Sequence, residues 1–107
     1  MLVRDILRVK GTALFTVGPE TLLSECVTVM ADLDIGSLVV LDAQRMVGML
    51  TFREVLQGLN AQGGNLADLR VKSLMVADPV CGSPDDSIDH LREVMTQNHV
   101  RYLPVKD

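Results

Sequence analysis

The fold is decided by residues 19–42, PETLLSECVTVMADLDIGSLVVLD, because residues 84–107, PDDSIDHLREVMTQNHVRYLPVKD, repeat them without a gap at an offset of 65 positions. The matched positions are mostly apolar: Leu23 with Ile88, Cys26 with Leu91, Val29 with Val94, Met30 with Met95, Leu38 with Leu103 and Val40 with Val105. VRDIL at 3–7 and VKSLM at 71–75 also resemble each other ahead of the two copies. The chain therefore contains two copies of one structural unit.

The first copy predicts a β-α-β-β-α unit. Pro19 and Thr21 are helix-start signals, apolar residues follow at helical spacing, and Gly36 is expected to close the helix. SLVVLD at 37–42 lacks alternation, which predicts a strand covered on both faces. A short turn leads to a second strand, MVGML, and then to a second helix. The expected fold class is α+β.

The stretch GMLTFREV at 48–55 marks the change from strand to helix. The Thr51 hydroxyl can accept a hydrogen bond from the helix's first amides, and the Glu54 carboxylate can accept one from the Thr51 amide. This arrangement is a capping box, a common device that by itself indicates no ligand.

The second copy predicts a strand at DPVCGS, a helix over 86–98 and a strand at VRYLPV. Pro104 lacks a backbone donor, so the last strand should lie at a sheet edge or face a ligand. The counterpart of GMLTFREV would lie beyond Asp107, so we expect an incomplete second repeat. The predicted organisation is a first repeat with an N-terminal helix at 1–59, a linker at 60–68 and a second repeat at 69–107.

Composition narrows the class of protein. The 107 residues are 48% apolar and 3% aromatic with a net charge of -4, which fits one ordinary domain and argues against nucleic-acid binding. No apolar run is long enough for a membrane segment, and a cytoplasmic location is expected. Cys26 and Cys81 are expected as free thiols. Catalytic motifs are absent, so we expect no enzymatic activity.

A family resemblance rests on the doubled unit and on four stretches: VRDIL, IGSLVVLD, GMLTFREV and VRYLPVKD. The chain resembles a tandem pair of CBS domains, a Bateman module named after cystathionine β-synthase. The resemblance implies two repeats about a pseudo-twofold axis, with clefts for adenosine-containing ligands: AMP, ADP, ATP, NAD or S-adenosylmethionine. It implies no metal. The expected function is ligand-dependent regulation and signal transduction by conformational change.

The resemblance also implies site residues. Thr51 matches a phosphate-binding hydroxyl, and Glu54 stands where the family has a ribose-binding Asp. The remaining residues implied for the cofactor-binding clefts are Ser37, Leu38, Val80, Cys81, His99, Arg101, Tyr102, Thr12 and Ala13.

Several alternatives remain open from the residues themselves. Thr51 and Glu54 serve as a helix cap with or without a ligand, and His99 at a helix end suits the dipole as well as a phosphate. Tyr102 fits a core role as well as a cleft role. The second hypothesis for the whole chain is a dimerisation module with degenerate clefts. A homodimer is expected under either hypothesis, and the regulated partner is unknown.

Overall fold

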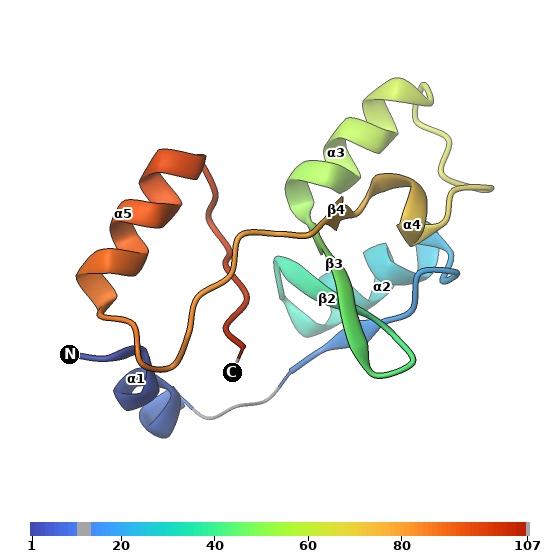
Figure 1. The fold of residues 1–107 in the computed structure, drawn as a ribbon. Helices are drawn as coiled ribbons and strands as arrows, with labels where there is room; N and C mark the ends of the chain where they lie inside the picture. The colour runs from blue at the N-terminus through green and yellow to red at the C-terminus, as the bar shows by residue number, and fades with distance from the viewer. Residues whose placement is uncertain (11–13, 107) are drawn as a thin grey trace. The chain divides into compact units, whose positions relative to one another are not determined.

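The computed structural model describes residues 1–10 and 14–106 (Figure 1). The chain divides into two compact units. One unit is the continuous segment Leu14–Asp78, called the central unit below. The other combines Met1–Ala13 with Pro79–Asp107 and is called the terminal unit. Each repeat of the sequence contributes to both.

The central unit contains a four-stranded mixed sheet. Its strands, in spatial order, are β1 (Thr16–Val17), β2 (Ser37–Asp42), β3 (Arg45–Thr51) and β4 (Val76–Ala77). β1 runs parallel to β2, and the other two neighbouring pairs are antiparallel. Helices and sheet together confirm the predicted α+β class, and the predicted β-α-β-β-α order of the first repeat is present.

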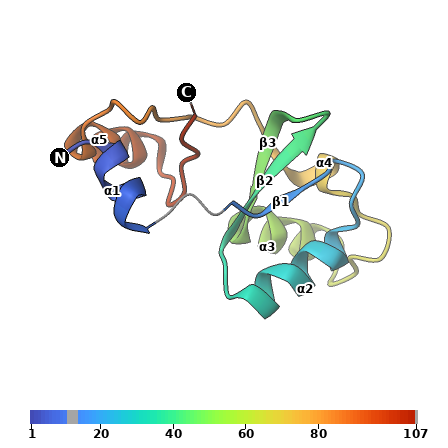
Figure 2. The ribbon, with the colours of Figure 1, turned by 90° about the horizontal axis from the view of Figure 1, so that it is seen from below.

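Helices α2 (Leu23–Leu33) and α3 (Phe52–Ala61) lie on the same face of this sheet, and the short helix α4 (Val71–Leu74) follows the connection from α3 (Figure 2). Apolar side chains from these elements make the core of the central unit: Leu23, Cys26, Met30, Leu38, Val40, Leu50 and Val71. Aliphatic and sulfur-containing side chains fill it without any aromatic ring. In β2, Leu38, Val39 and Val40 are buried consecutively, as the run without alternation predicts.

The end of α2 differs from the prediction. Asp34, and not Gly36, is the left-handed residue that closes the helix, with φ of 53° and ψ of 50°. Its N–H donates to the carbonyl oxygens of Ala31 and Met30, two acceptors that would otherwise be unpaired at the end of the helix. His99 closes α5 (Ile88–Asn98) of the terminal unit in the same way, with φ of 54°. Asp34 and His99 are equivalent positions of the two repeats.

The terminal unit holds α5 and α1 (Val3–Lys10). The predicted helix over 86–98 is confirmed from Ile88, with the Ser87 hydroxyl accepting from the His90 N–H. The predicted strands at DPVCGS and VRYLPV are shorter than expected, because the described residues there form only the parallel bridge between Gly82 and Val105. Pro104 lacks an N–H, and among the described residues no hairpin equivalent to β3 pairs with this edge, so a longer ladder does not form.

The leading segment of each repeat docks on the other repeat. Leu69 to Lys72 form three backbone hydrogen bonds with the start of α2: Leu23 N to Leu69 O, Val71 N to Thr21 O and Lys72 N to Pro19 O. Met1 to Arg4 make the equivalent three with the start of α5: Ile88 N to Met1 O, Val3 N to Asp86 O and Arg4 N to Pro84 O. The expected division at 1–59, 60–68 and 69–107 stays a prediction about the sequence repeats. The two compact units are divided differently, since each combines the leading segment of one repeat with the helix start of the other.

Candidate functional site

The strand-to-helix turn of the first repeat brings three predicted site residues together. Ser37 begins β2 and lies directly opposite Thr51, the last residue of β3. Thr51 is also the N-cap of α3, so it takes part in both elements. Glu54 follows one turn later on that helix. The helix begins here because Thr51 is extended, with φ of -121° and ψ of 172°, and its side chain accepts hydrogen bonds from the first amides of α3.

The predicted capping box is confirmed. Thr51 N and Thr51 Oγ1 both donate to Glu54 Oε1, each over 2.8 Å. The Thr51 side chain accepts from the N–H of Arg53 over 3.2 Å and from that of Glu54. Glu54 is only 7% exposed, so its carboxylate is held inside the turn and not displayed on the helix surface.

Leu38 lies beside Ser37 on β2, but its side chain is 1% exposed and belongs to the core. Only its backbone is therefore available to a ligand. The arrangement around Ser37, Thr51 and Glu54 offers hydroxyl and carboxylate oxygens at one end of the sheet, which suits hydrogen bonding to a polar ligand.

Other predicted residues lie in the terminal unit. His99, Arg101 and Tyr102 follow the end of α5 and are exposed. Val80 is 40% exposed, and the half-buried Cys81 lies with its Sγ 3.2 Å from the Pro79 carbonyl oxygen. The segment that follows α5 and the segment that contains Val80 and Cys81 are joined by the parallel bridge between Gly82 and Val105.

Thr12 and Ala13 lie outside the described residues. The structure therefore groups four of the predicted residues in the central unit and five in the terminal unit.

Sequence reasoning missed one participant, the carbonyl of Gly36. It accepts the N–H of Phe52 over 3.2 Å at the first residue of α3. A backbone acceptor leaves no signal in residue type, so only the structure reveals it.

The cysteines are free thiols in the structure. Cys26 is fully buried in α2, and burial, followed by the charge of Glu25, raises its pKa to about 11. Such a thiol is protonated and inert at neutral pH.

The described part of the chain shows neither a metal site nor a membrane-spanning helix. Residues 1–10 and 14–106 contain no group of three His, Cys, Asp or Glu side chains placed to hold a metal ion. Within the same residues, no helix is long and apolar enough to cross a bilayer.

Comparison with known proteins identifies the family. The CBS domain family model matches residues 3–61 and 71–107, and the chain therefore belongs to the CBS domain family. A CBS domain-containing protein of Bacillus subtilis, YhcV, is 29% identical over 96 residues, which are 90% of this chain and 68% of that protein. The prediction of a tandem CBS pair is confirmed.

Solved structures of CBS domain proteins have the same fold. The CBS-domain containing protein ATU1752 of Agrobacterium tumefaciens superposes with a TM-score of 0.94 at 30% identity, covering all of this chain and 86% of that one. The CBS domain pair of MJ0100, in complex with 5′-methylthioadenosine and S-adenosyl-L-methionine, gives a TM-score of 0.85 at 21% identity, covering 100% and 81%. That second likeness concerns the fold alone.

Proposed function

We propose that this chain is a regulatory module that binds an adenosine-containing ligand and transmits its presence through a change in conformation. The observation that carries the proposal is the Ser37–Thr51–Glu54 turn, where polar oxygens are held at a strand-to-helix junction of a CBS repeat. A structural neighbour that holds 5′-methylthioadenosine and S-adenosyl-L-methionine supports this ligand class. We assign the chain no catalytic step.

The proposed roles follow from residue chemistry. Ser37 and the carboxylate of Glu54 suit the hydroxyl groups of a ribose, since both can accept hydrogen bonds. The backbone of Leu38 suits a base edge. In the terminal unit, taken by itself, the proposed ligand contacts are Val80, Cys81, His99, Arg101 and Tyr102. Thr12 and Ala13 are proposed contacts of a second site.

Regulation requires that the ligand favour one conformation over another. A tenfold difference in affinity between two conformations shifts their equilibrium by about 1.4 kcal/mol. The ligand candidates are AMP, ADP, ATP, NAD and S-adenosylmethionine, together with 5′-methylthioadenosine. The proposal also includes a cytoplasmic location for the protein and a second protein, of unknown identity, that the module regulates.

Calorimetric titration and thermal shift with each of these ligands test the proposal. We expect at least one to bind with a Kd below about 1 mM. Ser37→Val should weaken that binding, whereas the matched change Ser24→Val on the exposed face of α2 should leave it unchanged. If no ligand binds at millimolar concentration, the proposed function is wrong.

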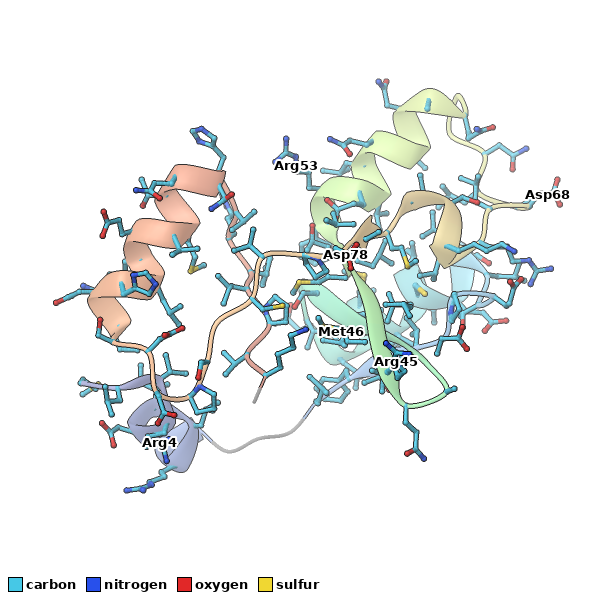
Figure 3. The ribbon with its side chains drawn as sticks, in the orientation of Figure 1. Arg4, Arg45, Met46, Arg53, Asp68 and Asp78 are labelled. Carbon is cyan, nitrogen blue, oxygen red and sulfur yellow. The ribbon has the colours of Figure 1, made fainter. Side chains whose placement is uncertain are left out.

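A second candidate function is self-association, and the outer face of α3 favours it. Phe52, Leu56 and Leu59 are 48%, 63% and 36% exposed and lie at i, i+4 and i+7, on one stripe of the helix. Beside this stripe lie Arg53, whose side chain projects outward from the first turn (Figure 3), and the neutral Gln57. A stripe with so little charge can pair with its own copy about a twofold axis.

Light scattering after size exclusion tests this candidate. If α3 forms the homodimer interface, Leu56→Lys should yield monomers at a concentration where the unaltered chain is dimeric. Leu33→Lys, at a comparably exposed leucine of α2, should remain dimeric. A monomeric unaltered chain would rule the candidate out.

A further inference from the structure

Glu54 is a buried carboxylate without a cationic partner in the described part of the chain. It is 7% exposed, and no Lys or Arg forms an ion pair with it among the described side chains. Its charge is instead balanced by the amide and hydroxyl of Thr51 and by the positive end of the α3 dipole. The carboxylate occupies the position where a helix start attracts an anion.

The backbone donors at this helix start are already engaged. Thr51 N donates to Glu54 Oε1, and Phe52 N donates to the carbonyl of Gly36. The amides of Arg53 and Glu54 both donate to the side chain of Thr51. A phosphate binds a helix start through such amides, so here it would have to displace bonds that the chain makes with itself.

The Thr51 hydroxyl is engaged in the same way. Its single proton is directed to Glu54 Oε1, so it cannot also be donated to a phosphate oxygen. A phosphate at this turn would moreover approach a buried negative charge. Like charges this close repel each other, and the repulsion is stronger in a turn shielded from bulk water.

We infer that Glu54 is a specificity-determining residue that closes this turn to phosphate and selects adenosine ligands that carry none, such as a 5′-thioether nucleoside. This inference rests on the proposed function, because it assumes that an adenosine ligand binds here. Both hydrogen bonds described for the carboxylate use Oε1, and Oε2 remains able to accept a ribose hydroxyl. The turn thus keeps a contact for the sugar while excluding the phosphate.

Calorimetric titration with 5′-methylthioadenosine and with AMP tests the inference, because the two share adenosine and differ at the 5′ group. We expect the thioether to bind at least about tenfold more tightly than AMP to the unaltered chain. Glu54→Gln keeps the size of the side chain and removes its charge, so it should reduce this ratio to about threefold or less, mainly by improving AMP binding.

Glu25→Gln is the matched control, since Glu25 is an exposed carboxylate on α2 of the same unit. It should leave the ratio unchanged, and circular dichroism with a thermal melt verifies that each variant folds. Equal affinities for the two ligands in the unaltered chain would overturn the role of Glu54 and leave the proposed function intact. If neither ligand, nor any other adenosine compound, binds the unaltered chain, the proposed function fails and this inference fails with it.

Discussion

Lys72 Nζ lies 2.7 Å from Glu20 Oε1, joining the leading segment of the second repeat to the helix start of the first. The equivalent positions of the other repeat, Arg4 and Asp85, form the equivalent ion pair. The two pairs accompany the same three backbone hydrogen bonds at each site. The helix start of each repeat therefore contacts the leading segment of the other repeat, and the two arrangements are equivalent.

The first prediction concerns the acid titration of Glu20. The hydrogen bond and charge of Lys72 hold its pKa below the ordinary value of 4.5. A lowered pKa in the folded state means that the pair stabilises the fold above pH 4.5 and loses this effect as pH falls through the folded value. NMR titration should show the pKa of Glu20 rising in Lys72→Met. Lys106→Met, in the terminal unit, should not move it.

The second prediction concerns the left-handed residue at the end of α2. Asp34 has a positive φ and places a negative charge at the negative end of the helix dipole. Asp34→Gly should therefore stabilise the protein by about 0.5–1 kcal/mol in denaturant unfolding. Ala31→Gly, three residues earlier within the helix, should destabilise it by about 1 kcal/mol. The same sign for both changes would contradict the assignment of Asp34 as the cap.

The third prediction concerns the hairpin between β2 and β3. Its two central residues, Ala43 and Gln44, have φ of 50° and 66°, which requires a primed turn favoured by Asn-Gly. Arg45 begins the next strand at this tip (Figure 3). Replacing Ala43–Gln44 with Asn-Gly should raise the free energy of unfolding by about 1 kcal/mol. Ala43→Val should lower it, because a β-branched residue tolerates positive φ poorly.

Particular residues show how far sequence reasoning reaches. The repeat offset and the T-x-x-E pattern predicted the first repeat's elements and the Thr51–Glu54 box, because burial and capping leave their mark on residue type. The sequence predicted Gly36 and not Asp34 as the residue that closes α2, because glycine adopts the left-handed conformation more readily than aspartate.

The exchange of leading segments and the Gly36 carbonyl were missed for a different reason. Both rest on hydrogen bonds between backbone groups, which leave no signal in residue type, although an ion pair accompanies each docked segment. The sequence could therefore indicate which side chains gather near the turn of α3, but not that its donors are already satisfied.

The fourth prediction concerns thiol reactivity. With a pKa of about 11 and a fully buried side chain, Cys26 should resist a disulfide reagent at pH 8, whereas the half-buried Cys81 should react. One thiol should therefore titrate in the native protein and two after unfolding. Rapid reaction of two thiols in the native state would contradict the burial of Cys26.

The same residue predicts a loss of stability in alkali. Below the ordinary thiol pKa of 9.0, Cys26 is protonated whether or not the chain is folded. Between pH 9 and about 11 the unfolded chain loses this proton first, so the free energy of unfolding should fall as pH rises. Cys26→Ala should be less stable at neutral pH because it leaves a small cavity, and it should lack this part of the alkaline slope.

The last prediction concerns Gly48, where β3 approaches β4. A Cβ at this position would lie 2.8 Å from the backbone oxygen of Val76 and 2.8 Å from the Met75 sulfur. A backbone atom cannot rotate away, so Gly48→Ala should separate the two strands and destabilise the protein by roughly 1–3 kcal/mol. Gly18→Ala is the control, since its nearest neighbour would be Thr21 Oγ1 at 3.8 Å, an ordinary contact. An equal loss of stability for the two changes would show that the cost comes from glycine flexibility and not from the close approach of β4.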